Sequence, residues 1–185
     1  MNKLMTGSLL LILCNLFYLA WWIVAFKPGV EARRTWLAAL LVGTATVVGI
    51  IGVVQLVGAI RSAVMKRSLF NGMILIVCGF AAYILLILIT WFFMHRQITL
   101  ELLLIDGWVI LELSLINLLY GTEKLSFAGA VIFIVILAAA VIAVMYFYMA
   151  YYNLEKEAAF IDGTIPLIIT AAFMAARTVF TLIAG

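Results

Sequence analysis

The chain has 185 residues, of which 69% are hydrophobic, whereas a soluble domain has roughly 45–50% apolar residues. Only 11 lysines and arginines and 8 aspartates and glutamates are available to cover its surface, and the net charge is +3. So few charges cannot solvate a chain of this length in water, so lipid must be its main solvent. The composition therefore excludes a soluble enzyme, a nucleic-acid-binding domain and any large domain outside the membrane.

Charged and turn-forming residues divide the chain into six apolar intervals. The intervals are residues 6–26, 36–60, 69–94, 100–120, 125–151 and 163–184. Each is long enough to cross a hydrocarbon core of about 30 Å at about 1.5 Å per helical residue. We therefore predict an all-α integral membrane protein, with a single polytopic membrane domain over residues 1–185 and six transmembrane helices arranged as hairpins.

The basic residues give the expected topology of the chain. Five lysines and arginines fall outside the spans on each side of the membrane, so the positive-inside rule finds no majority. The free N-terminal amine then favours both termini in the cytoplasm, and we expect the protein in a bacterial cytoplasmic membrane. Arg177 lies inside the sixth interval, where we expect its long side chain to snorkel to the nearer interface.

One side of the membrane holds all five tryptophans, whichever way the chain inserts. Six of the eight acidic residues share that side. An interfacial aromatic belt accounts for tryptophans at the membrane surface, but such belts form on both sides. An aromatic-lined vestibule, in which carboxylates and tryptophan rings attract cations, is the functional alternative.

The triplet Ile-Asp-Gly occurs twice, with Asp106 and Asp162 separated by 56 residues. This spacing predicts a parallel repeat of the third and fourth helices in the fifth and sixth, and repeat-built transporters bind substrate near the midplane. We expect each aspartate to cap a helix entrance, the alternative being a pair of ligands at the floor of the vestibule. Pro166 then fits the first turn of the sixth helix.

The fourth interval carries the most informative polar residues. Glu112 lies near its middle, where an ionised carboxylate costs about 2.5–3.5 kcal/mol on insertion scales. Glu101, Trp108 and Glu112 are spaced i, i+7 and i+11, so they form one stripe from the tryptophan-rich side to the midplane. Asp106 and Asn117 fall on the opposite side of the same helix. A helix that is polar on two faces is expected near the centre of the bundle.

Two further polar side chains, Asn15 and Gln55, lie deep in the first and second intervals. Each can form a hydrogen bond between helices or contact a solute. A stripe of small residues beside Gln55 predicts close packing of the second helix. The stripe consists of Ala45, Gly49, Gly52 and Ala59.

The leading hypothesis is transport or binding of a small solute, cationic or amine-bearing, that enters from the tryptophan-rich side. The substrate-binding candidates are Glu112, Trp108, Glu101, Asp106, Asn117, Asn15 and Gln55. Glu112 is then a cation or proton site, although it can instead be a protonated hydrogen-bond donor that locks helices together. The expected partners are the lipid bilayer, the solute and further membrane subunits, with no nucleic acid.

Two other classes of function stay open at this stage. The chain can be a non-transporting scaffold or regulatory subunit, with its small-residue stripe exposed for docking, or an intramembrane lipid-modifying enzyme. We favour a protein that is not an enzyme, because no nucleophile or phosphate-binding motif is present. The single histidine and the absence of a His/Cys cluster give no reason to assign a metal or cofactor.

Overall fold

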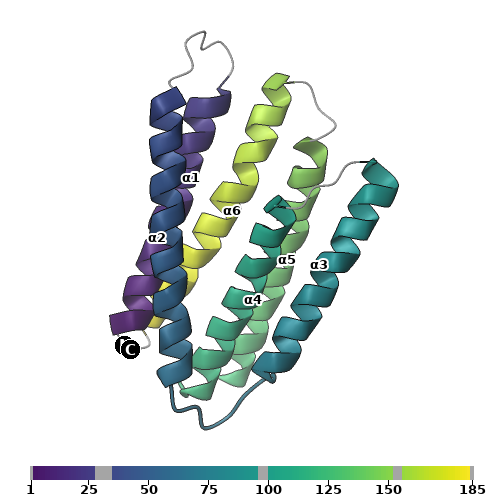
Figure 1. Ribbon diagram of the computed structural model, residues 1–185. Coiled ribbons are helices and arrows are strands. Elements are labelled where there is room, and N and C mark those ends of the chain that lie inside the picture. Colours follow the sequence, from purple (N-terminus) through teal and green to yellow (C-terminus); the bar gives the residue numbers. More distant parts are fainter. Residues whose placement is uncertain (1, 28–34, 96–99, 152–155, 184–185) are drawn as a thin grey trace. The chain divides into compact units, whose positions relative to one another are not determined.

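The structure is a computed structural model that describes residues 2–27, 35–95, 100–151 and 156–183. Within these ranges the chain is helical and contains no strand, so the predicted all-α class is confirmed (Figure 1). The helices are α1 (Asn2–Phe26), α2 (Thr35–Ser62), α3 (Gly72–Met94), α4 (Leu100–Gly121), α5 (Phe127–Tyr151) and α6 (Lys156–Ile183).

Each of the six helices contains an apolar segment that is long enough to cross a membrane. The segments have between 20 and 28 residues, and about 20 suffice to span the hydrocarbon core. The prediction of six spans is therefore confirmed, and the chain is a multi-pass integral membrane protein.

The expected capping role of the two repeated aspartates is wrong. α4 begins at Leu100 and α6 at Lys156, so Asp106 and Asp162 each lie six residues inside a helix. Pro166 consequently lies in the interior of α6 rather than in its first turn. Proline has no backbone N–H, so the carbonyl of Asp162 lacks its usual donor four residues further on. The parallel repeat of the two helix pairs stays a prediction.

The described chain forms two compact units whose boundary falls inside α5. Unit 1 comprises Met1–Ser62 and Ala138–Gly185, and unit 2 comprises Ala63–Leu137. Unit 1 thus contains α1, α2, α6 and the second part of α5, whereas unit 2 contains α3, α4 and the first part of α5. The prediction of a single domain is not tested by this division and stays a prediction.

In unit 1, α1 and α2 are antiparallel neighbours in close contact (Figure 1). Glycines allow this approach, because a methyl group at Gly49 would lie 2.8 Å from Cys14 Sγ. One at Gly7 would lie 2.9 Å from the carbonyl oxygen of Gly52. Gly52 is buried in the small-residue stripe of α2, as is Ala45. Two members of the stripe, Gly49 and Gly52, thus pack closely against α1 of the same chain.

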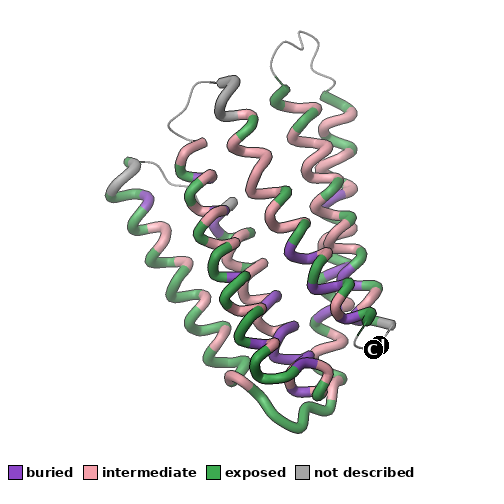
Figure 2. The backbone as a smooth tube through the Cα atoms, turned by 180° about the vertical axis from the view of Figure 1, so that it is seen from behind, coloured by how far each residue is buried: buried purple, intermediate pink, exposed green. Residues whose placement is uncertain are grey.

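In unit 2, α3 packs against α4 but is otherwise open. Among its described side chains only Thr90 is buried, and the others are exposed or half-buried (Figure 2). The exposed side chains are apolar along most of the helix, as expected for a surface in contact with lipid tails. Gly79 provides the close contact with α4, because any side chain there would overlap Ile110.

Candidate functional site

The centre of the candidate site is Glu112, which is fully buried in the middle of the span of α4. It continues a stripe of core residues at i, i+3, i+4 and i+7, since Leu115, Ile116 and Leu119 are also at most 1% exposed. Glu112 therefore occupies a position that an apolar residue would normally fill in this pattern. A carboxyl group enclosed at this depth is costly, and the protein must compensate it by hydrogen bonds, charge or protonation.

Trp108 lies one helical turn before Glu112 and is half-buried. Residues four apart are neighbours on one face of a helix, so the indole and the carboxyl group lie on the same stripe of α4. The side chain of Glu101 lies outside the described residues. The structure therefore describes the inner two members of the predicted stripe, and the outer one stays a prediction.

Two polar residues were predicted on the other side of α4, Asp106 and Asn117. Their side chains face different parts of the chain. Asp106 is half-buried and faces α3, where its Oδ2 lies 3.7 Å from the position of a methyl group on Gly79. It forms no hydrogen bond with a described residue. Asn117 lies eleven residues further along and contacts the linker between α2 and α3, so α4 does not bring the two together.

Asn117 forms three hydrogen bonds with that linker, two of them with its backbone. Its Oδ1 accepts hydrogen bonds from the backbone N–H of Leu69 (2.7 Å) and from Ser68 Oγ (3.2 Å). Its Nδ2 donates to the carbonyl oxygen of Phe70 (3.3 Å). Both ends of the carboxamide are therefore occupied, and Asn117 is 7% exposed. The observed role of Asn117 is to anchor the linker.

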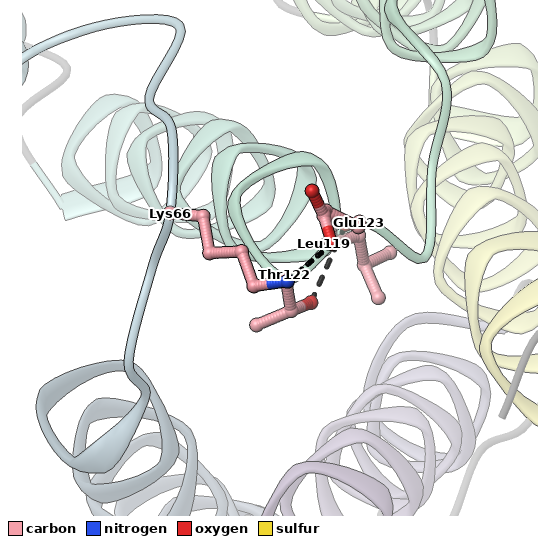
Figure 3. A network of polar contacts seen from close by, with 4 residues as sticks. All are labelled: Lys66, Leu119, Thr122 and Glu123. Atoms are coloured by element: carbon pink, nitrogen blue, oxygen red, sulfur yellow. Dashed lines mark hydrogen bonds and ion pairs between the residues drawn. The ribbon is translucent and has the colours of Figure 1, made fainter.

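The same linker also contacts the end of α4, and we call residues 66–70 together with 117–123 the linker clamp. The N–H of Lys66 donates to the carbonyl of Gly121 (2.9 Å), and the guanidinium of Arg67 lies 4.7 Å from the ring centroid of Tyr120. Lys66 Nζ forms an ion pair with Glu123 Oε2 at 2.8 Å (Figure 3). The polar contacts of the clamp thus gather at one end of α4.

Glu123 terminates α4 with a left-handed backbone, at φ 62°. Its N–H donates to Tyr120 O (3.1 Å) and the N–H of Lys124 donates to Leu119 O (3.0 Å), which is the Schellman pattern of a helix end. Glycine usually occupies this position. The hydrogen bond and the positive charge of Lys66 hold the pKa of the Glu123 carboxyl below its ordinary value of 4.5.

Unit 1 contains a second polar region, along the contact between α1 and α6. Three layers occur there at intervals of seven residues on both helices, and we call them the α1–α6 seam. Arg177 Nη1 donates to Ser8 Oγ (3.1 Å), and Asn15 Nδ2 donates to Thr170 Oγ1 (2.7 Å). In the third layer the Trp22 ring packs against Gly163, and its Nε1 donates to the carbonyl of Phe160 (3.2 Å).

Arg177 does not snorkel to the membrane surface, contrary to the expectation from the sequence. Its side chain is fully buried, and so is that of Ser8, which is 1% exposed. The expectation failed because it considered only the length of the arginine side chain and the nearer interface. Ser8 Oγ of α1 instead accepts a hydrogen bond from the guanidinium, which has five N–H groups.

The two remaining candidates, Asn15 and Gln55, lie in unit 1 and differ in their contacts. Asn15 forms the interhelical hydrogen bond that its depth suggested, with Thr170 as the acceptor. Gln55 is half-buried in α2 and forms no hydrogen bond with a described residue. Of the seven candidates, five therefore belong to unit 2 and two to unit 1.

The sequence contained a signal for the α1–α6 seam that the inspection of single polar residues missed. Ser8, Asn15 and Trp22 recur every seven residues, and Gly163, Thr170 and Arg177 do the same in α6. A seven-residue recurrence on two helices is the pattern of an extended helix–helix contact. The signal was obscured because the recurring residues are chemically different.

Comparisons of the chain with models of protein families, with curated proteins and with solved structures found no match. Among the described residues, no group of three or more histidine, cysteine, aspartate or glutamate side chains could hold a metal ion. The functional argument therefore depends on the enclosed polar residues themselves.

Proposed function

We propose that this multi-pass membrane protein binds and transports a small solute, cationic or amine-bearing, with Glu112 as the central residue of the site. The observation that carries the proposal is the complete burial of a carboxyl group in the middle of a membrane span. Ionisable residues at this depth are rare in membrane proteins and mark substrate, ion or proton pathways.

Trp108 supports a cation as the solute. Its ring lies one turn from Glu112 on the same face of α4, and tryptophan is the side chain that attracts cations most strongly through its π face. A carboxylate and an indole on one stripe can bind an ammonium group by charge and by the ring together. We propose entry from the side that carries the tryptophans and most of the acids, with Glu101 at the outer end.

The scaffold alternative is weakened by the packing of α2. That alternative required the small-residue stripe to be free for docking, whereas Gly49 and Gly52 contact α1 within the chain. No observation favours an intramembrane lipid-modifying enzyme. We therefore retain solute binding, with further membrane subunits as candidate partners and a bacterial cytoplasmic membrane, both termini inside, as the proposed location.

The test is uptake of radiolabelled methylammonium into proteoliposomes. Glu112→Gln keeps the size and hydrogen-bonding capacity of the side chain but removes its charge, and we expect uptake to fall by about tenfold or more, the effect of about 1.4 kcal/mol. Glu123→Gln is the matched control, because it removes a carboxylate just beyond the end of α4, outside the membrane span. This control should transport as the unaltered protein does.

Thermal unfolding separates the binding role from a structural one. If Glu112 only locks helices together, Glu112→Gln should lower the unfolding temperature and uptake should change no more than that of an equally destabilised variant. If Glu112 binds the solute, uptake is lost while the unfolding temperature is retained. Unchanged methylammonium uptake in a folded Glu112→Gln variant would refute the proposal.

A further inference from the structure

A second polar group at the middle of the membrane lies in the α1–α6 seam and does not depend on the Glu112 proposal. Asn15 lies at the middle of the apolar segment of α1, and Thr170 at the middle of that of α6. Their hydrogen bond, from Asn15 Nδ2 to Thr170 Oγ1, is 2.7 Å long. The Oδ1 atom of Asn15 is buried and has no hydrogen-bond partner among the described residues.

The chemistry of Thr170 fixes which end of the carboxamide stays open. Its Oγ1 lies 3.0 Å from the carbonyl oxygens of both Pro166 and Leu167, and its single proton is donated to them. The hydroxyl can then only accept from Asn15, so Asn15 must present its NH₂ group to Thr170. The oxygen of Asn15 is therefore the atom left without a donor.

An open acceptor at this depth requires an explanation. Lipid tails provide no hydrogen-bond donor, and a buried polar group without a partner costs free energy. Pro166 adds a second acceptor in the same helix, because it cannot donate to the carbonyl of Asp162. Pro166 lies four residues before Thr170, one helical turn nearer to the Trp22 layer. The two open acceptors, Asn15 Oδ1 and the carbonyl oxygen of Asp162, therefore lie in the part of the seam between the Thr170 layer and the Trp22 layer.

The charges nearby select a neutral ligand. An amide oxygen carries only a partial charge and cannot neutralise a cation in a region of low dielectric constant. On α6, the charged side chains closest to Thr170 in sequence are Arg177 and Asp162, about 10 and 12 Å along the axis at 1.5 Å per residue. α1 and α2 contain no acidic residue, so these three helices of unit 1 offer a cation at Asn15 no adjacent carboxylate, whereas a neutral molecule with an N–H or O–H group needs none.

We infer that Asn15 Oδ1 and the Thr170 layer form a binding site for a small neutral hydrogen-bond donor, of the amide or urea class. Water has the same donor chemistry and is the competing occupant. The ligand donates one N–H to Asn15 Oδ1 within the contact between α1 and α6. This site concerns a different class of solute from the ammonium group proposed for Glu112, and each can fail without the other.

Stopped-flow light scattering of proteoliposomes tests the site, with acetamide as the solute probe and sucrose as the impermeant osmolyte that reports water flux. Asn15→Leu removes the acceptor at nearly constant size. We expect acetamide permeability to fall by about fivefold, the factor that one hydrogen bond contributes. Thr46→Val is the matched control in unit 1, because the Thr46 hydroxyl is exposed and bonds only to Val42 of its own helix.

Two results would overturn the inference. Acetamide permeability equal to that of the unaltered protein and of Thr46→Val would show that Asn15 does not bind the solute. A fall in water permeability alone would assign the open acceptor to water. Should Asn15→Leu not fold, Asn15→Ser and Asn15→Ala provide a pair of nearly equal size that differs in one hydroxyl acceptor. Faster acetamide flux through the serine variant supports the inference, and equal flux refutes it.

Discussion

The α1–α6 seam in unit 1 and the linker clamp in unit 2 use polar contacts at different depths. In the seam the polar contacts are spread along two spans, with one layer every seven residues, and two of its three hydrogen bonds join side chains inside the apolar segments. The clamp gathers its contacts at the end of α4, where Lys66 and Glu123 are exposed. Inside the span, unit 2 places the enclosed Glu112 on a stripe that is otherwise apolar.

The different depths of these polar contacts predict how strongly substitutions in each region lower the stability of the protein. A hydrogen bond inside a span has no water to replace a missing partner, so its loss leaves a polar group unsatisfied. An ion pair at the membrane edge exchanges with water and contributes little to stability. Substitutions in the seam should therefore lower the free energy of unfolding far more than substitutions in the exposed part of the clamp.

The largest expected effect is that of Arg177→Met, which keeps the length of the side chain but removes its charge and donors. Ser8 then loses the guanidinium that donates to its hydroxyl, and we expect the free energy of unfolding to fall by about 2–3 kcal/mol, as for hydrogen bonds to charged groups. The measurement is thermal unfolding of the detergent-solubilised protein. Arg61→Met is the control, since Arg61 is exposed in the last turn of α2.

Equal unfolding temperatures for Arg177→Met and Arg61→Met would contradict this contrast between enclosed and exposed positions. Arg177→Lys sharpens the result. It retains the charge but not the planar array of donors, so a stability between those of the unaltered protein and Arg177→Met is expected.

A smaller effect is expected at the two glycines of the repeated triplet. A methyl group at Gly163 would overlap the Trp22 ring, so Gly163→Ala should lower the free energy of unfolding by about 1–2 kcal/mol, as overpacking does. At Gly107, no neighbouring atom of the described residues lies within 4 Å of the position of such a methyl group. Gly107→Ala should therefore raise the free energy of unfolding by about 0.5–1 kcal/mol, the difference in helix propensity between glycine and alanine.

These two substitutions are matched, because each changes the residue after the aspartate of an Ile-Asp-Gly triplet. Chemical denaturation of both variants in mild detergent gives the comparison. Opposite signs of the change in the free energy of unfolding would show that the two corresponding positions differ in packing. A destabilised Gly107→Ala variant would contradict the prediction, because it would require a contact that the described residues do not contain.

The sequence predicted the six spans because each is a long apolar run, and the solvent alone requires such a run to be helical. It did not predict the start of α6, because the predicted interval begins at residue 163, after the charged Asp162, whereas the helix already includes Lys156. The error at Asp162 has the same origin, because an interruption of hydrophobicity was interpreted as an interruption of the helix. The partner of Asn15 could not be predicted from one position, as Thr170 lies 155 residues away.

The smallest effect concerns the ion pair of Lys66 and Glu123. Since the pKa of Glu123 is lowered in the folded state, its contribution is present above its ordinary value of 4.5 and is lost as the pH falls through the lowered value. Lys66→Met should raise that pKa toward 4.5. The unfolding temperatures of the two proteins should therefore differ by a small constant above about pH 5 and converge at lower pH.

Unfolding temperatures measured between about pH 7 and pH 3 check this prediction. Lys3→Met is the control, because Lys3 is also exposed and forms no ion pair with a described residue. A difference between Lys66→Met and the unaltered protein that stays constant to the lowest pH would show that the ion pair is not its cause.

The seven-residue interval of the α1–α6 seam has a consequence for motion. An ideal α-helix turns through slightly less than two full revolutions in seven residues, by about 20°, so a contact kept over three layers requires the two helices to coil around each other with a left-handed sense. Sliding one helix past the other by less than seven residues would place each polar side chain opposite an unrelated one. We therefore expect α1 and α6 to rotate and shift as one body during any conformational cycle of the protein.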